Sequence, residues 1–326
     1  MNLKFYFTIG IIGFSVPINS VLAQSFSLKK PPTQYLRLKL DNDMLILREK
    51  TDRYYSSGIK LNYTIDNNPT HSSWISKIFP QLKDAKNYHG YTLATNMYTP
   101  ANITELAIHG DRPYAGWAYV GLTGISNSKS ASTRFATEYT LGAIGPLTQQ
   151  EFMQKRMHKI IDRPQPQGWK NQIANDIALN LSFVGEKRFG KSSENLELMG
   201  VIETNVGTVT NYMGLGALLR IGWFEDYFKN IASISKQQNW QIFVFARPVA
   251  RIVADNALLQ GGIFTYSKSP YVISKDDLKR CYLEAEFGYS LSFRSFNITY
   301  SQNVRTPEFE GAKNMFWGSV AFSYGL

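Results

Sequence analysis

The sequence predicts an all-β protein, a transmembrane antiparallel β-barrel of about twelve strands with a short helix in an outer loop. Apolar and polar residues alternate with a period of two in many segments, as they do in strands between lipid and lumen. Beyond the extreme N-terminus there is no run of about 18 apolar residues, which excludes a helical membrane protein. The 326 residues are 44% hydrophobic, 14% aromatic and only 18% charged, which excludes a disordered chain.

The first 23 residues have the pattern of a secretory signal peptide. Lys4 supplies a positive charge, and the apolar stretch at 5–16 is too short to span a bilayer. Val21 and Ala23 place small residues at the −3 and −1 positions before Gln24. We therefore expect residues 24–326 to form one exported domain. The single cysteine excludes a disulfide-stabilised scaffold.

The alternation is clearest in the last strand, residues 315–326. Its even positions carry bulky apolar side chains such as Phe316 and Phe322, whereas its odd positions include Ser319 and Ser323. An even number of strands of about ten residues closes a barrel without a free edge. A periplasmic β-sandwich is the competing fold. The predicted strands span 34–41, 57–65, 90–97, 114–124, 132–143, 177–187, 195–207, 213–224, 240–253, 279–291, 295–303 and 315–326.

Strand parity assigns each connection to one end of the barrel. If the mature N-terminus is periplasmic, the connections 41–56, 98–113 and 144–176 lie at the outer end. The links at 126–130 and 294–295 are short, as periplasmic turns should be. Two periplasmic connections, 66–89 and 225–239, are longer than expected. We expect a short helix over Trp74–Leu82 in the first of these.

The outer connection after Pro146 has the pattern of a helix. Thr148 and Glu151 have capping-box spacing, and the predicted helix runs to about Ile161, before Pro164. Gln154 and His158 are four residues apart and therefore share one helix face. A lone helical histidine is more often structural than catalytic. An ordered helix with polar residues at the outer end of a strand nevertheless favours a site.

Several kinds of catalytic site are excluded by residue types. Of the four histidines, only His109 and His158 lie at the predicted outer end. One cysteine and no histidine pair at helical spacing exclude a thiolate zinc site and a paired-histidine metal site. No Gly-x-Ser-x-Gly motif occurs, which excludes an α/β-hydrolase. By contrast, Asn42-Asp43 and the start of the second strand meet at the outer rim, and their oxygens suit calcium. A polar turn is the alternative interpretation of this cluster.

Six short motifs, each weak alone, occur in a specific order over about half of the mature chain. Together they resemble the lipid A 3'-O-deacylase family of outer-membrane proteins. The motifs are Asn42-Asp43, Thr51-Asp52-Arg53-Tyr54-Tyr55-Ser56-Ser57-Gly58, Met97-Tyr98-Thr99-Pro100, Asp111-Arg112-Pro113-Tyr114-Ala115-Gly116-Trp117, Gly145-Pro146 with Gln154-x-x-x-His158, and Gly168-Trp169-x-Asn171-Gln172.

The resemblance implies a calcium-dependent hydrolase that cleaves the ester holding the 3'-acyloxyacyl group of lipid A in the outer leaflet. It implies that His158 is the general base that activates water. Asn42, Asp43, Ser56 and Gln154 would complete the catalytic site. The Ca²⁺ would be held by Asp43, Ser56 and Gly58, and would stabilise the oxyanion.

Recognition of the lipid phosphates departs from the pattern of some relatives, which place lysines after the Tyr-x-Pro motif. No lysine occurs between Tyr98 and Asp111, so we expect Arg53, Arg112 or other residues to bind the phosphates. The alternative interpretation of Asp111-Arg112-Pro113-Tyr114 is mainly a turn into the fourth strand. The net charge of +10 also favours a bisphosphorylated lipid. We expect a monomer in the bacterial outer membrane, with lipopolysaccharide as its partner and no affinity for nucleic acid.

Two alternatives from other functional classes remain open. The first is a passive pore, lined by inward charges such as Lys60, Glu284 and Glu286. The second is a phospholipase-type barrel that uses a serine and a histidine. A pore gives no reason for a helix carrying Gln154 and His158, and no outer His-x-Ser motif supports the phospholipase.

Overall fold

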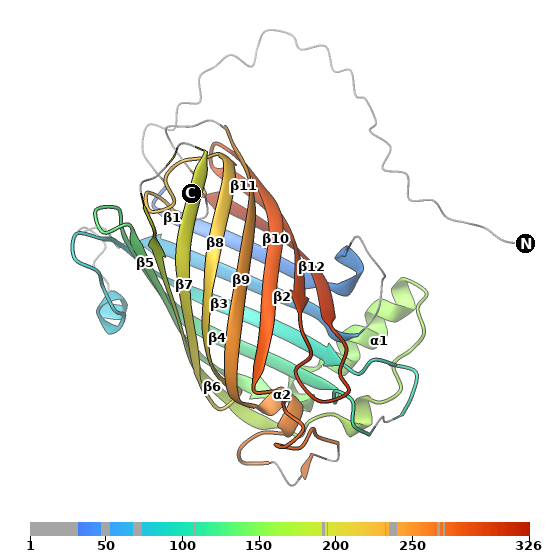
Figure 1. Ribbon diagram of the computed structural model, residues 1–326. Coiled ribbons are helices and arrows are strands. Elements are labelled where there is room, and N and C mark those ends of the chain that lie inside the picture. The colour runs from blue at the N-terminus through green and yellow to red at the C-terminus, as the bar shows by residue number, and fades with distance from the viewer. Residues whose placement is uncertain are drawn as a thin grey trace, which may run out of the picture. The chain divides into compact units, whose positions relative to one another are not determined.

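Figure 1 shows the computed structural model, in which antiparallel strands close into a barrel. The structure describes residues 32–46, 53–67, 74–106, 109–190, 193, 195–231, 233–234, 240–265, 268–269 and 271–326. The predicted signal peptide, residues 1–23, lies outside the described residues, as do Thr51 and Asp52 of the second motif.

Each strand pairs with its neighbours in the sequence, and β1 also pairs with β12, which closes the sheet. This confirms the predicted twelve-stranded antiparallel barrel, and every predicted strand is present within a few residues of its expected bounds. The strands of the described part of the chain are β1 (Gln34–Asn42), β2 (Tyr54–Asp66), β3 (Lys86–Thr99), β4 (Ala115–Ser128), β5 (Thr133–Ile144), β6 (Asp176–Arg188), β7 (Leu196–Gly207), β8 (Thr210–Trp223), β9 (Trp240–Asn256), β10 (Cys281–Phe293), β11 (Phe296–Arg305) and β12 (Met315–Gly325).

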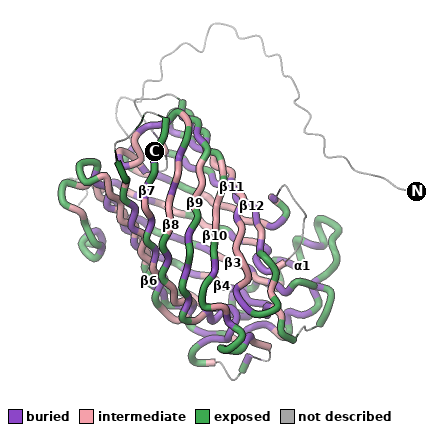
Figure 2. The backbone as a smooth tube through the Cα atoms, viewed as in Figure 1, coloured by how far each residue is buried: buried purple, intermediate pink, exposed green. Residues whose placement is uncertain are grey.

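The two faces of the sheet differ as the alternation predicts, and Figure 2 shows buried and exposed residues alternating along the strands. In β12, Ser319, Ala321 and Ser323 are buried toward the lumen, whereas Phe322 and Tyr324 are exposed on the outer wall. The wall therefore has an apolar outer surface and a lumen lined with small and polar side chains.

The connections carry the helices. At the predicted outer end, the β5–β6 connection contains the 3₁₀ helix η4 (Pro146–Thr148), α1 (Gln150–Ile160) and the 3₁₀ helix η5 (Trp169–Asn171), and the β9–β10 connection contains α2 (Ala257–Gln260). The β1–β2 connection begins with η1 (Asp43–Leu45). The helix expected at Trp74–Leu82 is a shorter 3₁₀ helix, η3 (Trp74–Ile78). No helix in the described ranges is long and apolar enough to cross a membrane.

Both ends of the lumen are occupied by folded chain. The long β8–β9 connection packs inside the barrel, where Phe228 contacts Met199 and Leu218 on the inner faces of β7 and β8. Its length, unexpected for a periplasmic turn, follows from this packing. At the outer end, α2 inserts Leu258 against the inward-facing Ala115.

Ion pairs link luminal side chains between these two ends. Glu284 pairs with Arg251 at 2.8 Å and with Arg305 at 2.6 Å, and Lys60 pairs with Glu138 at 2.9 Å. Two of the charges expected to line a pore, Lys60 and Glu284, are therefore bound in ion pairs across the strands.

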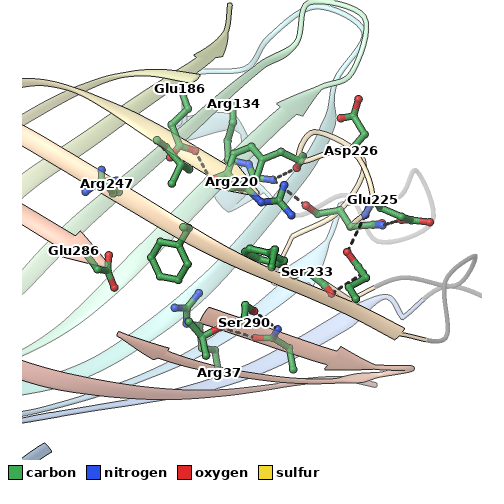
Figure 3. A pocket seen from close by; sticks show the side chains of 18 residues that line it. Arg37, Arg134, Glu186, Arg220, Glu225, Asp226, Ser233, Arg247, Glu286 and Ser290 are labelled. Carbon is green, nitrogen blue, oxygen red and sulfur yellow. Dashed lines mark hydrogen bonds between the residues drawn. The ribbon is translucent and has the colours of Figure 1, made fainter. Parts of the chain in front are cut away.

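A cavity of about 220 Å³ remains in the lumen beside the β8–β9 connection (Figure 3). Arg134 donates to the carbonyl oxygens of Tyr227 and Asn230 there, at 2.6 and 2.8 Å. The hydroxyl group of Tyr227 in turn donates to Glu186 at 2.6 Å. These contacts fasten the connection to the barrel wall.

Candidate active site

The ends of β1 and β2 meet at the outer end of the wall through Asn42. Its side-chain oxygen accepts a hydrogen bond from Met44 N at 2.8 Å and so caps η1, while its amide nitrogen donates to Ser56 O at 3.0 Å. The next residue, Asp43, is only 2% exposed. The structure thus brings together Asn42, Asp43 and the start of β2, as predicted.

A β-bulge between Tyr55 and Ser57 leaves Ser56 as the extra residue in β2. The Ser56 hydroxyl group lies 2.6 Å from that of Thr99, which occupies the outward face of β3. The bulge therefore turns Ser56 toward the outside of the barrel, on the wall that also carries Asn42.

Gly58 has a packing role that the sequence did not reveal. A Cβ atom at this position would lie 2.0 Å from the hydroxyl oxygen of Tyr55. That hydroxyl group lies 2.9 Å from both Asp41 Oδ2 and Asn96 Oδ1 on the luminal side. Only the backbone of Gly58 is available as a ligand, and its place in the metal site stays a prediction.

The capping box predicted for α1 is wrong. The Thr148 hydroxyl group donates to Gly145 O at 2.7 Å inside η4, and α1 begins at Gln150 after Gln149, which has a positive φ of 59°. Gly145-Pro146 initiates a separate 3₁₀ turn. Because the Thr148 hydroxyl group bonds within that turn, it does not cap α1. Glu151 pairs instead with Lys155 at 2.5 Å. The predicted C-terminal end near Ile161 is confirmed.

The start of α1 rests against the outside of the barrel wall. Gln150 Nε2 donates to Thr95 Oγ1 at 2.5 Å, and Thr95 faces outward from β3. On the neighbouring β4, a Cβ atom added to Gly116 would lie 1.9 Å from Thr148 Oγ1. The absence of a side chain at Gly116 therefore lets the helix approach the sheet closely.

Unlike an ordinary surface helix, α1 buries polar side chains. Its buried residues are Gln150, Gln154 and His158, spaced at four residues along one face. Its apolar side chains point away, and Phe152 and Ile160 are 58% and 70% exposed. The helix therefore buries polar side chains and exposes both apolar and basic ones, and Figure 1 shows α1 beside the barrel.

His158 has a defined proton arrangement. Its Nδ1 atom lies 2.7 Å from the carbonyl oxygen of Pro164. Because a carbonyl oxygen can only accept, Nδ1 must carry the proton. The neutral imidazole then has its lone pair on Nε2, the arrangement that a general base needs. The other outer histidine, His109, packs against the ring of Tyr271 at 4.9 Å.

Gln154, one turn before His158, is held by a residue that sequence reasoning did not assign to the site. The indole Nε1 of Trp169 donates to Gln154 Oε1 at 2.6 Å. Trp169 is completely buried in a cluster with Met97, Ile103 and Tyr114. The Gly168-Trp169 motif was the available signal, but a tryptophan in a loop does not reveal its partner.

The two arginines expected to bind phosphate occupy different surroundings. Arg53 donates from Nη2 to Asn314 O at 3.1 Å at the surface. Arg112 is buried in an ion pair with Glu308, and its guanidinium lies 5.1 Å from the centre of the Tyr98 ring. Burial alone would raise the pKa of Glu308, but Arg112 and Arg305 lower it more strongly, so the pKa is depressed. This geometry favours a structural role for Arg112, and its contact with substrate stays a prediction.

The donor atoms near Asn42 suit a hard cation. Asp43 offers a carboxylate, Ser56 a hydroxyl group, and the bulge offers backbone carbonyls, all of which are oxygen ligands of the kind calcium takes. Within the described ranges, no group of three or more His, Cys, Asp and Glu residues is placed to hold a metal. Any metal here would depend mainly on neutral oxygens.

The sequence matches the family described as "Outer membrane protein LpxR" over residues 7–326. The chain belongs to the LpxR family. This membership and the closed barrel place the protein in the bacterial outer membrane. No curated protein matches the chain.

Solved structures support the same fold. LpxR from Salmonella typhimurium is 19% identical, with a TM-score of 0.73, over 90% of this chain and 100% of the other. The β domain of the Bordetella autotransporter BrkA is 9% identical, with a TM-score of 0.46, over 91% of this chain and 100% of the other. The first of these likenesses shows the fold, and the second is too low to add to it.

Proposed function

We propose that this protein hydrolyses the ester that holds the 3'-linked acyloxyacyl group on lipid A, in the outer leaflet of the outer membrane. The observation that carries the proposal is the contact between His158 Nδ1 and Pro164 O, which leaves Nε2 as the basic atom of a neutral imidazole. Membership of the LpxR family supports the substrate and the location.

The position of α1 supports a reaction at the membrane surface. The helix covers the outward side of the wall, and it exposes apolar side chains such as Phe152 and Ile160 beside the basic side chains of Lys155, Arg156 and Lys159. Such a mixture of apolar and basic side chains suits the interface between acyl chains and anionic lipid head groups. A polar site between helix and wall can receive a lipid sideways from the leaflet.

His158 carries the proton transfers of the proposed hydrolysis. His158 Nε2 takes a proton from water as the water oxygen bonds to the ester carbonyl carbon. The tetrahedral intermediate then collapses, and the bond between the carbonyl carbon and the sugar oxygen breaks. The imidazolium returns the proton to the departing sugar oxygen. A carboxylic acid and a free hydroxyl group result.

Calcium held by Asp43, Ser56 and the Gly58 carbonyl would supply positive charge near the oxyanion. Asn42 fixes the strand ends that present these ligands, through its bonds to Met44 and Ser56. Arg53, at the surface beside Asn314, is the better placed of the two arginines for a lipid phosphate.

Replacing His158 with alanine tests the proposal. We expect hydrolysis to fall by roughly 10²- to 10⁴-fold, the usual contribution of a general base. Mass spectrometry of lipid A from cells making equal amounts of folded barrel measures the loss of the acyloxyacyl unit. Lys159→Ala, the exposed neighbour on α1, is the matched control and should keep full activity. Undiminished hydrolysis by the His158 variant would remove the histidine from the mechanism.

The two alternatives predict different products. A pore would leave lipid A intact and conduct ions across planar bilayers, but chain occupies both ends of this lumen. A phospholipase-type barrel would release fatty acid from glycerophospholipid vesicles that contain no lipid A. Activity on such vesicles alone would overturn the proposed substrate.

A further inference from the structure

The carboxamide of Gln154 is buried but only half satisfied by the protein. Its side chain is 4% exposed, and Oε1 accepts the indole proton of Trp169. Its Nε2 atom has no hydrogen-bond partner among the described residues. A buried amide donor without a partner destabilises the folded state, so its persistence calls for a ligand or a water molecule.

Trp169 determines which end of that carboxamide faces the site. An indole nitrogen can only donate, so it selects the carbonyl oxygen of Gln154 and turns both Nε2 protons away from itself. A flip of the amide would place two donors against each other. The orientation of the Gln154 side chain is therefore set by Trp169 and not by the helix.

The indole itself is held rigidly. Its ring centroid lies 4.7 Å from that of Tyr114, and Met97 and Ile103 complete the buried cluster. The carbonyl oxygen of Trp169 also accepts a hydrogen bond from Gln172 N at 3.1 Å, which ends η5. A donor mounted on such a support needs little reorganisation during a reaction.

We propose that Trp169 is a positioning residue that aims Gln154 Nε2 at the ester carbonyl oxygen as that oxygen gains negative charge. Gln154 and His158 occupy the same buried face of α1, one turn apart, so donor and base act on the same reacting group. This inference rests on the proposed hydrolysis of lipid A.

Trp169→Phe keeps the aromatic packing and removes the indole proton. We expect kcat for lipid A hydrolysis to fall about tenfold while KM stays within twofold, because the donor acts on the transition state. Gln154→Glu keeps an acceptor for the indole but loses both amide protons, so it should lose as much activity as Gln154→Ala. The measurements use full-length protein in detergent micelles with purified lipid A.

A double-mutant cycle separates positioning from packing. In the Gln154→Ala background, Trp169→Phe should change kcat by less than twofold, since no amide remains to be aimed. Tyr114→Phe is the matched control, because it removes a buried hydroxyl group that donates to Ile103 O at 3.0 Å on the same cluster. Ile103 O also accepts from Gln167 N, so this control should retain wild-type kcat.

The outcomes distinguish this inference from the proposed function. If the wild-type barrel leaves lipid A unchanged, the proposed function fails. If the wild type is active and Trp169→Phe matches it, the positioning role is refuted while the function stands. An equal loss from Trp169→Phe with and without Gln154, or a rise in KM alone, would also refute it, since either would indicate general distortion of the site.

Discussion

Replacing Arg112 with alanine should destabilise the barrel without weakening substrate binding. The Arg112 side chain is fully buried and Glu308 is 4% exposed, so the substitution would leave a buried carboxylate short of one cation. Removing one member of a buried ion pair typically costs about 3–5 kcal/mol. Arg305 still contacts Glu308 Oε1 at 3.0 Å, which places the expected loss at the lower end, about 3 kcal/mol.

Equilibrium unfolding in lipid vesicles, followed by tryptophan fluorescence, measures this loss. The double variant Arg112→Ala/Glu308→Gln should be less destabilised than the sum of the two single variants, because no buried charge is then left unpaired. If Arg112→Ala retained full stability but raised KM for lipid A, the structural assignment would be refuted. That result would instead support the phosphate-binding role expected for Arg112 from the missing lysines.

Three further expectations concern the metal, the contact of α1 with the barrel wall, and pH. Asp43→Ala should lower hydrolysis, and excess calcium should partly restore it. A chelator should inhibit the wild type, and equal rates with and without chelator would exclude the metal from the mechanism. Gly116→Val should push η4 and α1 off the wall and reduce activity at least tenfold, since its Cβ would meet Thr148 Oγ1 at 1.9 Å. Gly124→Val on the same strand, which displaces Phe79 instead, is the control that should stay active. Because the pKa of Glu308 is depressed in the folded state, its ion pairs stabilise the protein above the unfolded-state pKa of about 4.3 and lose that effect as pH falls through the lower folded value. The stability difference between wild type and Glu308→Gln, measured from pH 7 to pH 3, should therefore shrink only in acid.

The barrel was predictable because alternation is a local property. Each strand has its lipid face and its lumen face within about ten residues, and β12 shows both plainly. The path of a long connection is not local. Phe228 of the β8–β9 connection carries no period that distinguishes a residue packed inside the lumen from one at the periplasmic surface, so only its unusual length hinted at its position.

The meeting of the two strand ends was predictable from the sequence, but the contacts that hold the candidate side chains were not. Asn42 and Ser56 belong to adjacent strand ends, and antiparallel pairing brings such ends together. The capping prediction failed because Thr148 had a nearer acceptor in Gly145 O. Arg112 pairs with Glu308, 196 residues away, and Trp169 pairs with Gln154, 15 residues away in the same connection. Motif spacing reveals neither pairing.

The packing inside the lumen has a consequence for the permeability of the outer membrane. In the described part of the chain, the β8–β9 connection packs into the lumen at one end and α2 packs into it at the other. We therefore expect cells with many copies to keep their normal resistance to hydrophilic antibiotics and bile salts. The proposed hydrolysis at the outer wall would then leave the permeability barrier of the membrane unchanged.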